Sequence, residues 1–172
     1  KDGFHGDTSA TFYVGTPSEQ AKHVTEVSRM SLELGIAEVK EGARIGDIGA
    51  AIQQYAESQG CSVVQDYVGH GIGREFHTAP QVPHYGTRGT GKRLKAGMVF
   101  TIEPMINLGH YACERLDDEW TVVTADGSLS AALLNDAIPH PLHVRTPKSD
   151  WPPSHRTRNL SGATLTAGTK RY

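Results

Sequence analysis

Three positions in the chain place a side chain that can bind a metal ion next to glycine or proline. Asp7 follows Gly6 in the run GDTS, His70 stands between two glycines in GHGIG, and Glu103 precedes Pro104 in TIEPM. Two carboxylates and one imidazole suit Co, Mn, Fe or Zn, and three protein ligands leave room for a water molecule. A metal ion lowers the pKa of such a water molecule and polarises a carbonyl group. The set therefore predicts metal-assisted hydrolysis.

Each of the three residues also has a structural interpretation. An Asp beside Gly and Thr is typical of a turn or cap. A buried Glu103 needs a metal ion or another partner, and an ion pair with Arg74 or Arg115 would supply one. The glycines of residues 69–73 predict that something approaches the chain closely at His70. A phosphate loop is disfavoured there, because the run is not GxGxxG and no lysine stands in a Walker arrangement. Spacing along the sequence does not show that the three residues meet.

A second imidazole, His77, follows His70 by seven residues. It is the candidate for hydrogen-bonding a substrate amide or a developing oxyanion. Alone, either histidine is more often structural than catalytic. Two histidines in one glycine-rich loop favour a site.

The elements that must position these residues alternate in type. Residues 11–14 predict a short strand, and an amphipathic helix follows from Ser18. A second helix has its apolar residues on one face, and Gly60 is placed to end it. Strands are predicted at residues 62–64, 98–102 and 120–123, and Pro104 stops the ladder of the second. The apolar helix positions are Ala21, Val24, Val27, Met30, Ile45, Ile48, Ile52 and Tyr55. The pattern predicts a mixed α+β domain with mainly antiparallel pairing.

Charge and proline content divide the chain near residue 132. Residues 1–131 hold 11 Lys and Arg against 17 Asp and Glu, whereas residues 132–172 hold 6 against 2 and contain five of the nine prolines. The second segment lacks helical or strand periodicity and is predicted to be disordered. We expect one folded domain over residues 1–131 and a tail over 132–172.

Composition excludes several classes of function. The net charge of -2 and pI near 6.5 give no electrostatic reason to expect nucleic acid or an anionic membrane as partner. No apolar run reaches a membrane span, and the first residues do not resemble a signal peptide. Cys61 and Cys113 are in no CxxC arrangement and are predicted to be reduced thiols. We expect a cytoplasmic monomer. The chain also begins without Met, which suggests that upstream residues are missing.

The motifs resemble those of type I methionine aminopeptidases, in order and approximate spacing, over residues 1–131. The resemblance rests on residues 3–9 (GFHGDTS), 67–74 (YVGHGIGR) with Phe76, His77 and Pro80, 97–105 (GMVFTIEPM) and 120–122 (WTV). It implies an incomplete pita-bread fold, an antiparallel sheet covered by helices. It also implies that the substrates are the N-termini of nascent polypeptides and that the protein acts near the ribosome.

The resemblance assigns roles residue by residue. Asp7 corresponds to a bridging aspartate, His70 to the histidine ligand and Glu103 to the first glutamate ligand of a site with two divalent metal ions. His77 resembles the histidine that contacts the substrate. Phe76 and Trp120 resemble walls of the pocket for the methionine side chain, and their flat apolar rings suit a thioether. The structural alternative is that both rings simply pack in the hydrophobic core.

Two departures limit these assignments. The second aspartate ligand of the family would precede Lys1, and no glutamate follows residues 127–131 (GSLSA) where the family has its second. We therefore expect at most one well-held ion and low activity. We hypothesise that residues from about 132 are a frame-shifted or foreign tail. A non-catalytic pita-bread binding module and a proline-specific aminopeptidase relative are the alternatives.

Overall fold

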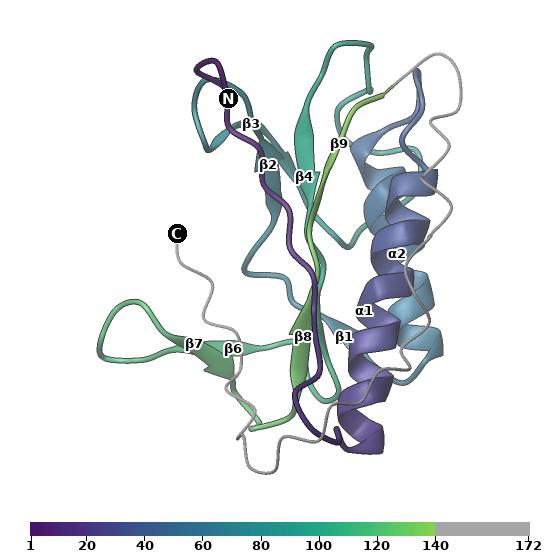
Figure 1. Cartoon of the computed structure of the whole chain (residues 1–172). Helices are drawn as coiled ribbons and strands as arrows, with labels where there is room; N and C mark the ends of the chain where they lie inside the picture. Colours follow the sequence, from purple (N-terminus) through teal and green to yellow (C-terminus); the bar gives the residue numbers. More distant parts are fainter. Residues whose placement is uncertain (140–172) are drawn as a thin grey trace.

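Two consecutive helices form one layer of the computed structural model, which describes residues 1–139 of the 172 (Figure 1). α1 spans Glu19–Ala37, and the Ser18 hydroxyl caps it by accepting a hydrogen bond from the Ala21 N–H at 3.1 Å. α2 spans Ile45–Ser58 and ends before Gly60, whose φ of 74° is the left-handed conformation that ends helices. Both predicted helices are confirmed. No helix among these residues is long and apolar enough to span a membrane.

The strands are short, and every pair of strands is antiparallel. Three sheets form, in the orders β1-β5-β8, β3-β2-β4-β9 and β6-β7. The bounds are β1 Ser62–Val63, β2 Gly69–Gly71, β3 Thr78–Val82, β4 Phe100–Ile102, β5 Met105–Asn107, β6 Cys113–Arg115, β7 Val122–Thr124, β8 Ser130–Ala132 and β9 Asn135–Ala137. This confirms the predicted α+β class with antiparallel pairing. The predicted strands at 62–64, 98–102 and 120–123 correspond to β1, β4 and β7, with ends shifted by one or two residues.

Two chain segments run through both larger sheets. β4 ends at Ile102 and β5 begins at Met105, so the ladder is interrupted at Glu103 and Pro104 as predicted. The partner segment is interrupted at the matching place, between β8 and β9. β4 pairs with β9 and β5 pairs with β8. Glu103 therefore lies at the junction between the two sheets.

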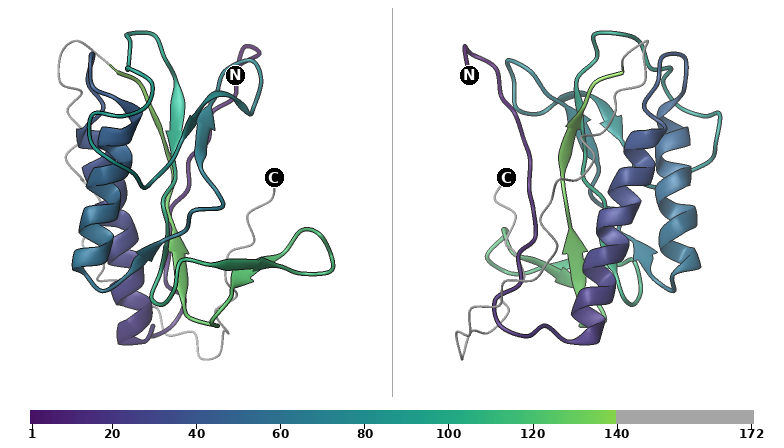
Figure 2. Two further views of the ribbon diagram at one scale, coloured as in Figure 1. Left: turned by 180° about the vertical axis from the view of Figure 1, so that it is seen from behind. Right: turned by 45° about the vertical axis from the view of Figure 1, so that its right-hand side comes forward.

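The sheet through β4 has an apolar face and a polar face. Phe100 and Ile102 belong to the core that packs against both helices. Thr101 and Glu103 alternate with them and face the other side. Figures 1 and 2 show the helices on one side of the sheet and the N-terminal segment on the opposite side. The core contains Val24, Val27 and Leu32 of α1, Ile45, Ile48, Ile52 and Ala56 of α2, and Val82, Phe100, Ile102, Ile106 and Ala137 of the strands.

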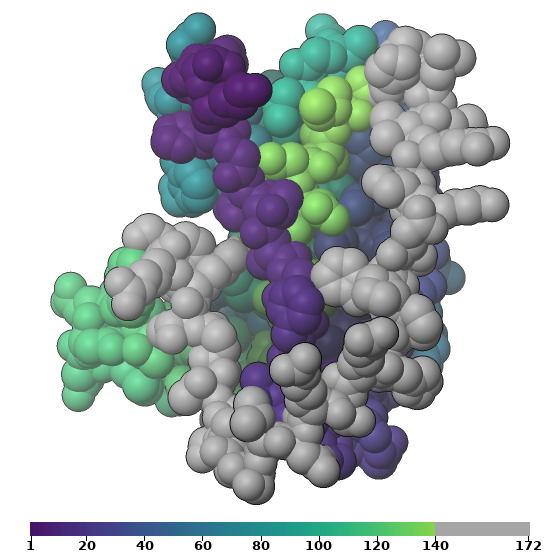
Figure 3. Space-filling model, viewed as in Figure 1, coloured from purple at the N-terminus to yellow at the C-terminus, as the bar shows by residue number. Residues whose placement is uncertain are grey.

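The N-terminal segment lies along the polar face of this sheet. The His5 N–H donates to the Gly73 carbonyl at 2.8 Å, and the Ser9 N–H donates to the Leu134 carbonyl at 3.0 Å. Figure 3 shows the segment, in purple, against the yellow-green residues of the last strand. Asp7 is thereby held over the face that carries Thr101 and Glu103.

The predicted strand at residues 11–14 is wrong. Within the described part of the chain, this segment forms no ladder, and its nearest pairing is the isolated bridge from Ser9 to Leu134. Phe12 is 70% exposed and Val14 is 57% exposed. Aromatic and β-branched residues favour a strand only where a neighbouring strand offers backbone partners and packing.

The prediction of disorder from residue 132 is wrong for residues 132–139. Asn135–Ala137 form β9, which pairs with β4, and Ala137 is buried in the core. The rest of the predicted tail, residues 140–172, lies outside the described residues. The predicted loop around His70 is instead β2 over Gly69–Gly71. Both cysteines are free, as predicted.

Candidate functional site

His70 and Glu103 meet on the polar face of the sheet. The Nε2 atom of His70 lies 3.4 Å from Oε1 of Glu103, whose side chain is only 3% exposed. The Nδ1 atom of His70 lies 3.1 Å from the Gly71 carbonyl oxygen. Because a carbonyl oxygen can only accept, Nδ1 carries a hydrogen and Nε2 is the atom presented to the carboxylate.

This contact favours a positive charge between its two atoms. A bare Nε2 lone pair facing a buried carboxylate oxygen is repulsive, and a cation between the two groups would relieve that repulsion. A backbone carbonyl that fixes Nδ1–H is also the usual arrangement behind a histidine that binds metal through Nε2. The donor set thus fits a divalent transition-metal ion.

Thr101 connects the two groups. Its hydroxyl donates to Glu103 Oε1 at 2.7 Å and accepts from the His70 backbone N–H at 3.0 Å. His84, which is 1% exposed, accepts the Glu103 backbone N–H through Nε2 at 3.0 Å. These contacts fix the position of Glu103 before any ligand binds. Residues that orient a ligand in this way tune both its basicity and its affinity.

The glycines beside His70 allow the backbone of neighbouring strands, rather than a ligand, to pack closely against β2. A Cβ atom at Gly69 would overlap the carbonyl oxygen of Thr101, and one at Gly71 would overlap the carbonyl oxygen of Ala79. The sequence correctly indicates a close approach at this point. The chain that approaches is the protein's own backbone.

Asp7 contacts a residue that the sequence did not single out. Its backbone N–H donates to Oδ2 of Asp136 at 3.1 Å. Burial raises the pKa of the Asp136 carboxyl; the Asp7 N–H lowers it, the Asp7 carboxylate raises it and His70 lowers it. Among residues 1–139, no three His, Cys, Asp or Glu side chains stand close enough together to hold an ion as they are placed. The structure therefore joins His70 to Glu103 and places Asp7 over the same face, without a preformed set of three ligands.

An aromatic group borders the His70–Glu103 contact. The His77 ring centroid lies 4.2 Å from that of His70 and 4.6 Å from that of Phe76. The His5 ring lies 5.5 Å from Phe76 in an edge-on arrangement. Phe76 is 37% exposed, so its ring is half open to solvent, and His77 is exposed. Both predicted substrate-contacting residues of this loop are thus next to His70.

Trp120 lies in a different part of the molecule. It belongs to the turn between β6 and β7, where its backbone N–H donates to Asp118 at 3.0 Å, and it is 41% exposed. Figure 1 shows this hairpin extending sideways, away from the two helices. Within the described residues, Trp120 makes no ring contact with Phe76. The assignment of Phe76 and Trp120 as walls of one methionine pocket therefore stays a prediction.

The two arginines considered as partners of Glu103 have other surroundings. The Arg74 guanidinium lies over the Phe4 ring, 4.5 Å from its centroid. Arg115 is on β6, in the projecting hairpin, where it pairs with Val122. The structure instead places the imidazole of His70 at Glu103, with Nε2 at 3.4 Å from Oε1.

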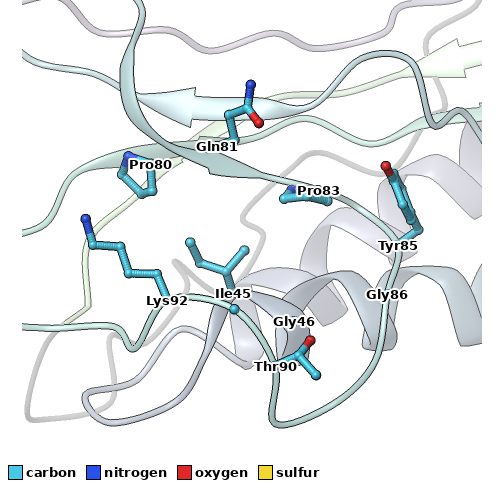
Figure 4. A pocket seen from close by; sticks show the side chains of 10 residues that line it. Ile45, Gly46, Pro80, Gln81, Pro83, Tyr85, Gly86, Thr90 and Lys92 are labelled. Atoms are coloured by element: carbon cyan, nitrogen blue, oxygen red, sulfur yellow. The ribbon is translucent and has the colours of Figure 1, made fainter.

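A cavity of about 390 Å³ lies apart from these residues, between the start of α2, β3 and the following loop (Figure 4). Its polar side chains are those of Gln81, Tyr85, Thr90 and Lys92. The backbone N–H groups of Ile45 and Gly46 at the start of α2 already donate to carbonyl oxygens of the same loop. The lining has no carboxylate, imidazole or thiol to bind a metal ion, and its ionisable side chains are those of Tyr85 and Lys92.

Comparison with known proteins places the chain beside metallopeptidases. The model of metallopeptidase family M24 matches residues 1–127. Methionine aminopeptidase A of Synechocystis sp. is 63% identical over 130 residues, which are 76% of this chain and 51% of that protein. Methionine aminopeptidase of Salmonella typhimurium is 55% identical over 131 residues, which are 76% of this chain and 50% of that protein. The chain spans about half the length of the curated relatives it matches.

Comparison with solved structures also finds a methionine aminopeptidase. The methionine aminopeptidase of Rickettsia prowazekii has a TM-score of 0.80 at 48% identity, covering 82% of this chain and 57% of that one. The prolidase of Thermococcus sibiricus has a TM-score of 0.59 at 27% identity, covering 80% of this chain and 32% of that one. The fold predicted from the resemblance, an incomplete match to the pita-bread type, is confirmed by these neighbours.

Three residues of this site were missed from the sequence. Thr101 could have been identified from the sequence, because it stands two residues before Glu103 and residues two apart on a strand lie on the same face. His84 and Asp136 could not, since their roles depend on pairings between distant parts of the chain. The change in charge and the proline content after residue 132 also concealed β9.

Proposed function

Since the chain belongs to metallopeptidase family M24, we propose that it functions as a methionine aminopeptidase, removing N-terminal methionine from nascent polypeptides in the cytoplasm. The observation that carries this proposal is the His70–Glu103 contact at 3.4 Å, with Nε2 as the presented atom. That pair supplies one nitrogen and one buried oxygen ligand of the kind a catalytic metal site needs. Asp7 is the proposed third ligand.

The proposed roles follow from position. A divalent ion held by these residues would polarise the scissile carbonyl and lower the pKa of an attacking water molecule. His77, exposed and beside His70, would donate a hydrogen bond to the substrate oxygen as negative charge develops on it. Phe76 would provide an apolar surface for the methionine thioether. Trp120, in the β6–β7 turn, would provide a second apolar surface.

We propose that activity is low. Residues 128–139 contain no glutamate, so the carboxylate that the resemblance expects after Ala131 is not supplied there. Fewer fixed ligands hold an ion less tightly and orient water less well. Co, Mn, Fe and Zn all suit the donor types present, and we propose that the chain binds a single ion.

Two alternatives make different predictions. A protein-binding module of the same fold would take up no ion at His70. A proline-specific peptidase would require proline next to the cleaved bond. The closer likeness to methionine aminopeptidases than to the prolidase, in identity and TM-score, favours the methionine enzyme.

The test is release of methionine from a Met-Ala-Ser peptide by the complete chain in Co²⁺ or Mn²⁺. The Salmonella typhimurium enzyme provides the reference rate. We expect slow turnover that is lost in His70→Ala and kept in His23→Ala, an exposed histidine of α1. Absence of any metal-dependent release would refute the function, and release at the reference rate would refute the low activity.

A further inference from the structure

Asp136 shares the polar face of the sheet with the proposed ligands. It is paired with Thr101 across β4 and β9, and directly opposite residues of antiparallel strands point to the same face. Its neighbour Ala137 is in the core on the opposite face. The sheet therefore gathers Asp136, Thr101 and Glu103 on one side, where the Thr101 hydroxyl already contacts His70.

The Asp136 carboxylate is incompletely satisfied. Oδ2 accepts the Asp7 N–H at 3.1 Å, but Oδ1 is buried and has no hydrogen-bond partner among the described residues. A buried carboxylate oxygen without a donor or cation destabilises the folded chain. Such an orphaned atom in a folded chain indicates a missing partner.

Within the described part of the chain, no Lys or Arg side chain supplies that partner. Among residues 1–139, none of the Lys and Arg ion pairs involves Asp7 or Asp136. The Asp7 N–H contact at 3.1 Å brings Asp7 and Asp136 together, and two carboxylates placed near each other repel. A divalent cation would satisfy the orphaned oxygen and offset the repulsion together.

We propose that Asp136 is a metal ligand of this chain, binding one divalent cation together with His70, Glu103 and Asp7. The proposal rests on the proposed function, because it adds a ligand to the same site. Asp136 would provide a carboxylate in the segment where the expected glutamate is absent. Since no three of these side chains converge as they stand, rotation of the carboxylates about their side-chain torsions accompanies binding.

The test is calorimetric titration of the complete chain with MnCl₂, comparing wild type, Asp136→Asn and Asp117→Asn. Asp117 is exposed in the β6–β7 turn and serves as the control for loss of one negative charge. We expect Asp136→Asn to weaken Mn²⁺ binding by about tenfold or more and Asp117→Asn to leave it unchanged.

Equal affinity of wild type and Asp136→Asn, with binding lost in His70→Ala, would overturn the role of Asp136 and leave the proposed function standing. Absence of Mn²⁺ uptake by wild type would instead overturn the metal site itself.

Thermal unfolding separates ligation from a structural role. Asn at position 136 keeps an oxygen that can accept the Asp7 N–H and removes the charge that faces Asp7. We therefore expect Asp136→Asn to unfold in EDTA at the wild-type temperature or above, with a smaller Mn²⁺-induced rise. A lower unfolding temperature in EDTA with an undiminished rise would refute the proposal.

Discussion

Replacing Thr101 by valine tests the hydrogen bonds that hold the His70–Glu103 contact. Valine has nearly the same shape, so the change removes the hydroxyl and little else. Thr101 is fully buried, and its hydroxyl donates to Glu103 at 2.7 Å while accepting from the His70 N–H at 3.0 Å. The substitution removes one hydrogen bond from the part-buried His70 N–H and one from the buried Glu103 carboxylate.

The expected loss of stability follows from these two contacts. An unsatisfied buried donor costs about 1–3 kcal/mol, and a hydrogen bond to a charged group contributes about 1.5–3 kcal/mol. Because neighbouring effects are not additive, we expect a total near 3 kcal/mol in the free energy of unfolding. Urea denaturation at neutral pH measures it, with an unchanged slope.

The matched control is Thr78→Val, at an exposed threonine on β3, where we expect a change within about 0.5 kcal/mol. A loss below about 1 kcal/mol for Thr101→Val would show that the hydroxyl does not bridge the two residues. The reasoning about a fixed Glu103 would then fail.

Three further outcomes are expected. Gly71→Ala should lower stability by about 3 kcal/mol in a urea titration, because its Cβ would overlap the Ala79 carbonyl oxygen; a neutral effect would contradict the packing of β2. Ser18→Ala should cost about 1 kcal/mol by removing the cap of α1. The His110 N–H, followed by the Ser128 hydroxyl and N–H, lowers the pKa of Asp126 to about 2, which NMR titration of its carboxyl can measure. Since the folded-state pKa is below the ordinary 3.8, the stabilisation by Asp126 is present above that value and is lost as pH falls toward about 2.

The sequence predicted the parts of the fold that local patterns determine. α1 and α2 were predicted because their buried residues recur at helical spacing and their ends carry Ser18 and Gly60. Pro104 marked the break between β4 and β5 because it has no N–H for the ladder. β9 was missed because a strand of three residues is stabilised by its pairing with β4, which no local pattern records.

The candidate site was predicted as a set of residue types but not as an arrangement. His70 and Glu103 were identified, and their contact depends on β2 lying beside β4. The glycines around His70 correctly indicated a close approach but not what approaches, because a neighbouring strand and a ligand leave the same signature in sequence. Asp136 stood in a segment whose composition suggested disorder, so only the three-dimensional pairing places it near Asp7.

The measurement that tests the central claim most directly is titration of the complete chain with Co²⁺, followed by its visible ligand-field absorption. If His70 and Glu103 hold a divalent ion, absorption should saturate at about one ion per chain, disappear in His70→Ala and persist in His23→Ala. No absorption in wild type, or undiminished absorption in His70→Ala, would contradict the account.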